Sequence, residues 1–112
     1  MRVVVDANVL CTALLSRGKT ADLLFSPKLK PIAPETLFIE VEKHKADLTV
    51  RSKLSSEEID ELLALFKRHI TIIPSEEFRD CFQEAQILLQ EHTKDTEYVA
   101  LALKMRCPLW SK

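Results

Sequence analysis

The sequence predicts an α/β fold in which a small parallel sheet lies between two layers of helices. Short β-branched or apolar runs alternate with longer segments whose apolar residues have helical spacing, and this alternation is typical of a parallel sheet covered on both faces. Glycine occurs only once, at Gly18, which argues against a glycine-rich phosphate loop or a barrel of tight turns. We expect about four strands and six to seven helices in a three-layer α/β/α arrangement.

The first part of the chain predicts one strand and two helices. Residues 3–5 are three valines, typical of a strand that is buried on both faces, and this strand ends at Asp6. Residues 7–16 have apolar positions at helical spacing and predict the first helix. A second, short helix is expected to begin at Thr20, because threonine is a favoured helix cap, and to end before Pro27.

The middle of the chain predicts a second strand and two longer helices. Residues 30–33 are expected to form the strand, and Pro34 is expected to lie in the first turn of a helix over residues 35–50. Ser55 and Glu58 have the spacing of a capping box, in which each side chain binds the backbone N–H of the other residue. A helix is therefore expected to begin directly after Ser55.

The last part of the chain predicts two further strands and two helices. Residues 70–73 are expected to form a strand, and Ser75 to cap the helix that follows it. Residues 95–105 are mostly small and apolar, so they predict a helix that is buried against the sheet. The final strand is expected within residues 106–110.

Composition excludes several classes of protein. The 16 basic and 17 acidic residues give a net charge of −1, which excludes a polybasic surface that binds nucleic acid over its whole area. No apolar run approaches the roughly 20 residues of a membrane helix, so we expect no membrane partner. The three cysteines are an odd number without C-x-x-C spacing, which favours reduced thiols in a cytoplasmic protein over disulfides or a zinc site.

Three acidic residues are placed where an open parallel sheet binds its ligands, outside the carboxyl ends of the strands. Asp6 ends the first strand, Glu40 lies among apolar residues on the helix after the second strand, and Asp95 opens the helix before the last strand. Three neighbouring carboxylates stay ionised only beside a cation, and Mg²⁺ or Mn²⁺ suits oxygen ligands. Such a site suits phosphodiester hydrolysis, because a divalent ion activates water and stabilises charge on the phosphate.

Each of the three acids also has a purely structural interpretation. Asp6 can cap the helix that follows it, and this role is compatible with a role in a site. Asp95 can cap its own helix in the same way, with Thr93 as the rival cap. Glu40 can be a solvated helix residue, with Glu42 as the rival for the site, although the helical phase favours Glu40.

Several segments resemble the motifs of the PIN-domain ribonucleases. Residues 3–10 resemble the opening strand and Asp-x-Asn-Val-Leu motif of that family, 34–44 its second acidic motif, 95–103 its third, and 107–111 the strand before its fourth. The resemblance spans the whole chain in the right order. It implies a metal-dependent endoribonuclease specific for single-stranded RNA, often the toxin of a toxin–antitoxin pair, so that RNA and an antitoxin protein would be its partners.

The resemblance also implies roles for individual residues. Asp6, Glu40 and Asp95 would be the catalytic carboxylates and the ligands of Mg²⁺ or Mn²⁺. Asn8 would support the site by hydrogen bonding. Glu97 is either a supporting acid in the same site or a favourable charge in the first turn of its helix.

A basic stretch follows the second acidic motif. Lys43, Lys45 and Arg51 form either a solvated helix face or a rim that contacts RNA phosphates. His44 lies four residues after Glu40, so it can face the same cleft and is a weaker candidate for a general base.

The chain departs from the family's pattern after the last strand. The fourth acidic motif has no counterpart, because Ser111 is followed only by Lys112. We therefore expect a single PIN-like domain over residues 1–112 that lacks the family's final element. The alternative is a catalytically weak or inactive domain that binds a partner protein, or itself as a homo-oligomer, through its exposed last strand. A receiver-type phosphoacceptor domain is disfavoured, because Ala7 rather than a second acid follows Asp6.

Overall fold

The computed structural model describes residues 1–16 and 18–111, and its centre is a parallel sheet. The four strands are β1 (Arg2–Val5), β2 (Lys30–Pro34), β3 (Thr71–Ile73) and β4 (Leu109–Trp110). Their order in space is β3-β2-β1-β4. β1 therefore lies inside the sheet, with Val4 paired to Ile32 on one side and to Leu109 on the other. The predicted parallel sheet is confirmed.

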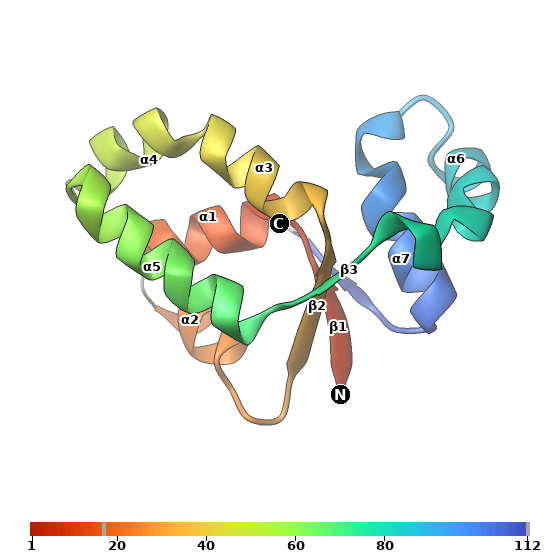
Figure 1. Cartoon of the computed structure of the whole chain (residues 1–112), viewed down its shortest axis with the longest axis horizontal. Helices are drawn as coiled ribbons and strands as arrows, with labels where there is room; N and C mark the ends of the chain where they lie inside the picture. Colours follow the sequence, from red (N-terminus) through yellow and green to blue (C-terminus); the bar gives the residue numbers. More distant parts are fainter. Residues whose placement is uncertain (17, 112) are drawn as a thin grey trace.

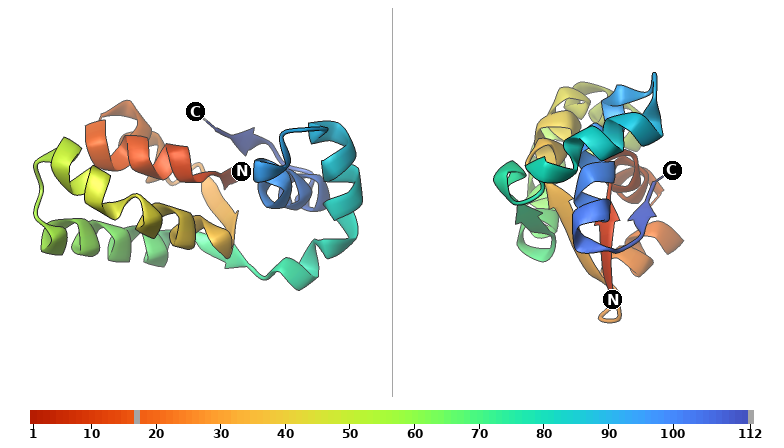
Figure 2. Two further views of the ribbon diagram at one scale, coloured as in Figure 1. Left: turned by 90° about the horizontal axis from the view of Figure 1, so that it is seen from above. Right: turned by 90° about the vertical axis from the view of Figure 1, so that its right-hand side faces the viewer.

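Helices cover both faces of this sheet. The described residues form seven α-helices: α1 (Ala7–Ser16), α2 (Lys19–Leu24), α3 (Thr36–Lys43), α4 (Lys45–Ser52), α5 (Ser56–His69), α6 (Phe82–Leu89) and α7 (Thr96–Met105). Helices α1 to α5 gather on one side of the sheet, and α6 and α7 lie on the other (Figure 1). Figure 2 shows the same separation from above. The predicted three-layer α/β/α fold is confirmed.

Short 3₁₀ turns precede the two helices of the second layer. They are η1 (Ser75–Glu77) and η2 (Arg79–Cys81) before α6, and η3 (Thr93–Asp95) before α7. None of the helices in the described part of the chain has the length and apolar character needed to cross a bilayer.

The core forms where the two helical layers meet the sheet. The valines of β1 are at most 5% exposed. In one layer, α7 contacts both β1 and β2 and buries Tyr98 and Leu101. In the other layer, α1 buries Val9 and Leu10 completely. Burial of these apolar side chains supplies most of the stability, and it fixes the carboxyl end of β1, where Asp6 follows, between two helical layers.

The start of α5 confirms the predicted capping box. Ser55 Oγ accepts a hydrogen bond from the backbone N–H of Glu58 (3.1 Å), and Glu58 Oε1 accepts one from the backbone N–H of Ser55 (3.1 Å). The two bonds satisfy backbone donors that the first turn of a helix leaves unpaired. The helix then buries Leu63 and Phe66 on one face.

The helix predicted over residues 35–50 is instead two helices, α3 and α4. They meet at His44, whose backbone leaves the helical conformation (φ −100°, ψ 7°). The break lets both helices contact α1 and lets both bury an apolar residue, Val41 on α3 and Leu48 on α4. The spacing of apolar residues predicts one continuous helix, but packing against α1 divides it into two.

Two other helix starts differ from the predictions. Thr20 lies inside α2 and is 5% exposed, so it is packed in the interior, and Gly18 takes the cap position without a side-chain bond. Pro34 is the last residue of β2 rather than part of α3, because it continues the pairing of β2 with β3 opposite Ile73.

The helix predicted to begin at Ser75 begins at Phe82. Ser75 opens η1 instead, and its backbone N–H donates to Glu35 Oε1 (3.1 Å). Phe78, between η1 and η2, is fully buried. Packing of this ring turns the chain tightly before α6 can begin.

Candidate functional site

The carboxyl ends of β1 and β2 lead to a cavity between the two helical layers. We call it the acidic cavity; it has a volume of about 200 Å³ and is lined by Asp6, Ala7, Asn8, Glu40, His44, Lys94, Asp95 and Tyr98. Asp6 follows β1, Glu40 lies on α3 directly after β2, and Asp95 ends η3. The four predicted residues Asp6, Asn8, Glu40 and Asp95 are thus brought together from three separate stretches of chain.

Asp6 has a structural and an electrostatic role at once. It is 8% exposed, and its Oδ1 accepts a hydrogen bond from the backbone N–H of Val9 (3.0 Å), which caps α1. Burial raises the pKa of Asp6 above its ordinary value; the Val9 amide opposes this rise and the charge of Asp95 adds to it. The cap interpretation is confirmed, and it is compatible with a carboxylate that lines the cavity.

Asp95 occupies the cap position of α7 but does not act as a cap. Its side chain makes no cap hydrogen bond. The rival cap, Thr93, contributes only its carbonyl, which accepts a hydrogen bond from Thr96 Oγ1 (2.6 Å). The exposed Asp95 carboxylate forms no ion pair with the described residues, so it is available to a ligand.

Glu40 and Tyr98 form the wall between α3 and α7. Burial raises the pKa of Glu40, the nearby Tyr98 hydroxyl opposes this, and the charge of Asp95 adds to it. Tyr98 is 2% exposed, and its hydroxyl lies close to Glu40 and Thr36 although it makes no hydrogen bond of good geometry to a described residue. Its pKa is raised by burial and by the charge of Glu40. Glu42 is exposed and does not line the cavity, so Glu40 is the acid that faces it.

Glu97 lies beside the acidic cavity rather than in it. Its Oε2 accepts a hydrogen bond from Thr36 Oγ1 (2.8 Å), which ties α7 to α3. It lines a second cavity that adjoins the first, and the two cavities share Glu40, Lys94 and Tyr98. Glu97 can therefore support the position of α3, which carries Glu40.

Two polar side chains of the acidic cavity, those of Lys94 and Tyr98, were not predicted from the sequence. Lys94 directly precedes Asp95, and Tyr98 follows Asp95 by three positions. That spacing places Tyr98 one helical turn after Asp95, on the same side of the helix. It is the sequence signal that could have placed Tyr98 in the site. His44, which the sequence did indicate, lines the cavity as well.

The predicted basic rim lies outside the acidic cavity. Lys45 pairs with Asp60 across α4 and α5 (2.6 Å), and Arg51 pairs with Asp47 within α4 (3.5 Å). Lys43 lies in the last turn of α3, where its charge lowers the pKa of Glu40. Contact of these three basic residues with RNA stays a prediction.

The donors of the acidic cavity fit a hard divalent cation. Within residues 1–16 and 18–111, no group of three or more His, Cys, Asp or Glu side chains is spaced as a preformed metal site. A close cage is not required, however, because Mg²⁺ commonly keeps several waters and binds through one or two carboxylates. Burial and then the charge of Asp95 raise the pKa of both Asp6 and Glu40. A cation would therefore favour the ionised form of these carboxylates.

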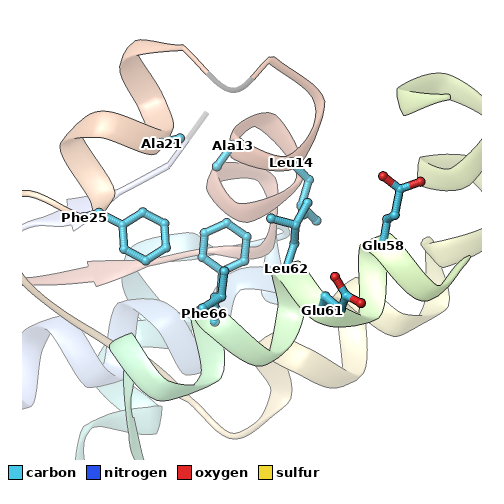
Figure 3. A pocket seen from close by; sticks show the side chains of 9 residues that line it. Ala13, Leu14, Ala21, Phe25, Glu58, Glu61, Leu62 and Phe66 are labelled. Atoms are coloured by element: carbon cyan, nitrogen blue, oxygen red, sulfur yellow. The ribbon is translucent and has the colours of Figure 1, made fainter. Parts of the chain in front are cut away.

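A second hollow has a different character (Figure 3). We call it the apolar groove; it has a volume of about 310 Å³ and is lined by Ala13, Leu14, Ala21, Phe25, Glu58, Glu61, Leu62, Leu65 and Phe66. The rings of Phe25 and Phe66 stack at its centre (5.3 Å between centroids, 20° between planes). Among the described residues of its lining, Glu58 and Glu61 are ionisable and the others are apolar.

Comparison with known families agrees with this arrangement. Residues 4–112 match the family described as the PIN domain, a range that contains Asp6, Glu40 and Asp95. A search of curated proteins gave no match. PIN domains are generally nucleases and typically use divalent metal ions, which suits a cavity of carboxylates at the carboxyl ends of parallel strands. On this match, which extends over almost the whole chain, the protein belongs to the PIN-domain family.

Proposed function

We propose that this protein is a divalent-metal-dependent endoribonuclease that hydrolyses phosphodiester bonds of single-stranded RNA. The observation that carries the proposal is the acidic cavity, in which Asp6, Glu40 and Asp95 line one hollow of about 200 Å³. No ion pair with a described residue neutralises any of the three. Asp6 is buried and Glu40 is partly buried, and carboxylates kept in this way without a neutralising partner are costly for a fold, which supports a role beyond structure.

The residues of the acidic cavity have different roles in the proposed reaction. Asp6, Glu40 and Asp95 would hold Mg²⁺ or Mn²⁺, with Asn8 in support. When bound, such an ion activates water and stabilises charge on the phosphate. Lys94 adds a positive charge at the same cavity, and it would attract an RNA phosphate toward the carboxylates.

The neighbours of the cavity suit a polyanionic strand. Lys43, Lys45 and Arg51 lie on α3 and α4, and we propose that they contact the RNA backbone outside the cavity. The role of toxin, with an antitoxin protein as its partner, is implied by the family resemblance and stays part of the proposal.

The test is cleavage of a labelled single-stranded RNA in the presence of Mn²⁺. Asp6→Asn and Asp95→Asn should each lower the cleavage rate by on the order of 100-fold or more, because each removes a negative ligand from the ion. Asp6→Asn keeps a side chain that caps helices as well as aspartate does, so α1 should remain intact.

Asp22→Asn provides the matched control. Asp22 is an exposed aspartate on α2 that does not line the acidic cavity, so its substitution should leave the rate unchanged. Cleavage that survives both Asp6→Asn and Asp95→Asn would end the proposal.

A second candidate function is protein interaction by a catalytically weak PIN domain, and the edge of the sheet favours it. β4 is an edge strand in the order β3-β2-β1-β4, and such edges readily pair with another strand. An apolar hollow of about 280 Å³ adjoins β4 and is lined in part by Met1, Leu29 and Trp110. Leu23, which also lines it, is 53% exposed. We propose a second copy of the chain as the partner at this edge.

Sedimentation velocity tests self-association at this edge. A dimer that Leu23→Lys dissociates would support it, because the substitution places a charge in the apolar hollow. Ile87→Lys is the matched control, since Ile87 is 69% exposed on α6 and does not line that hollow. A monomer that binds Mn²⁺ would count against this candidate and for the nuclease.

A further inference from the structure

A second cavity continues the acidic cavity along α7. It has a volume of about 390 Å³ and lies between α3, α6 and α7. It shares Glu40, Lys94 and Tyr98 with the acidic cavity. We infer that this second cavity binds one nucleobase of the RNA strand, next to the phosphate that the acidic cavity would take. The inference rests on the proposed function, to which it adds a subsite for base recognition.

An aromatic ring forms one wall of this subsite. Phe82, the first residue of α6, lines the cavity and is half-buried. Its ring packs against the fully buried Phe78 (5.7 Å between centroids, 37° between planes), which fixes its orientation. Bases of single strands stack on aromatic side chains held in this manner, and the ring tolerates any base because each base has a π-face.

An amide lies beside the ring. Gln86 follows Phe82 by four positions on α6, so both side chains lie on the same face of the helix, and both line the cavity. Gln86 is exposed, and its side-chain amide has no hydrogen-bond partner among the described residues. Its amide offers two donors and an acceptor, the groups needed to read the edge of a base.

The charges of the subsite favour a neutral base there and a phosphate at its boundary. Glu40 and Glu97 both line the cavity, and two carboxylates repel a phosphate. Lys94 lies on the wall that the two cavities share, and it forms no ion pair with a described residue. A strand with its phosphate beside Lys94 and the adjoining base against Phe82 keeps the phosphate near the positive charge and away from the two carboxylates.

The buried hydroxyl of Tyr98 lies on the same shared wall. Its oxygen is inaccessible to solvent and lies close to the side chains of Glu40 and Thr36, so it belongs to the wall that the two cavities share and is not a group open to the ligand.

Binding of short labelled homo-oligoribonucleotides of each base tests the subsite. The full chain carrying Asp95→Asn is used, so that the strands stay intact, and the dissociation constant is measured by fluorescence anisotropy. Adding Phe82→Leu should weaken binding by about tenfold, because the stacking surface is lost while an apolar side chain remains. Adding Gln86→Ala should change the ratio of dissociation constants between the four bases.

Gln83→Ala is the matched control, because Gln83 is exposed on the same helix and does not line the cavity. Circular dichroism shows whether Phe82→Leu unfolds the protein. If it does, the ratios of dissociation constants measured with Gln86→Ala still test the subsite. The inference is overturned if no oligonucleotide binds, or if the folded variants bind every base as their parent does.

Failure of this inference is distinguishable from failure of the proposed function. Wild type that cleaves RNA, with Phe82→Leu and Gln86→Ala binding as their parent does, overturns the subsite and leaves the nuclease. Base-dependent binding that the two substitutions alter, without any cleavage by wild type, supports the subsite and overturns the nuclease.

Discussion

The acidic cavity and the apolar groove lie at opposite ends of one helix and have opposite energetics. α1 begins beside the acidic cavity, where Asp6 caps it, and its Ala13 and Leu14 line the apolar groove. At the first end, burial of carboxylates raises the pKa of Asp6 and Glu40. At the second end, apolar side chains pack together (Figure 3), and Ala13, Leu14 and Phe66 are at most 3% exposed.

The difference shows how stability and the proposed function are separated within a small fold. The apolar end contributes stability through burial. The acidic end lowers stability, because burial and the neighbouring charge of Asp95 disfavour the ionised forms of Asp6 and Glu40. Substitutions at the two ends should therefore affect different properties, and this separation can be measured.

The largest effect on stability is expected at the apolar end. Leu14 is 2% exposed, so Leu14→Ala should lower the free energy of unfolding by about 2–5 kcal/mol through lost burial and a cavity. Chemical denaturation measures this loss. Cleavage of RNA per folded molecule should stay at the wild-type rate; a selective loss of cleavage would show that the two ends are not separate.

A smaller effect separates the two roles of Asp6. Asp6→Ala should lower the free energy of unfolding by about 1 kcal/mol relative to Asp6→Asn, because alanine cannot accept the hydrogen bond from Val9 and asparagine can. Both variants should lose cleavage of RNA to the same degree. Equal stability of the two variants would contradict the capping role.

The smallest effect is the dependence of stability on pH. The pKa of Asp6 is raised in the folded protein above its ordinary value of 3.8, chiefly by burial. The folded state therefore binds this proton more tightly than the unfolded state, so the contribution to stability is fully present below pH 3.8 and is lost as pH rises through the folded pKa.

Denaturation in metal-free buffer over a range of pH measures this contribution. Relative to Asp6→Asn, the wild type should lose stability as pH rises from acidic toward neutral values. A gain in stability over that range would mean that the folded protein favours the ionised form of Asp6 even without a cation.

Local signals made much of the fold predictable. The valines of β1 and the capping box at Ser55 and Glu58 are read from a few neighbouring residues, and both are confirmed. The break at His44 was not predicted, because it depends on α3 and α4 both packing against α1. Helical spacing alone does not record a contact with another helix.

The candidate site was predictable in part for the same reason. Asp6 and Asp95 stand at the ends of elements, where the sequence alone indicates a position near the sheet edge. Lys94 and Tyr98 were missed, because their place in the acidic cavity depends on how η3 and α7 lie against α3. Their convergence with Glu40 is a property of the tertiary fold.

Binding of Mn²⁺ tests the central claim, that the acidic cavity holds a divalent cation, most directly. Isothermal titration calorimetry compares the wild type with Asp95→Asn, whose exposed side chain makes no cap hydrogen bond that the substitution would remove. We predict that the wild type binds Mn²⁺ and that Asp95→Asn binds it at least about tenfold more weakly. Equal affinity of the two proteins, or no binding by the wild type, would contradict the account.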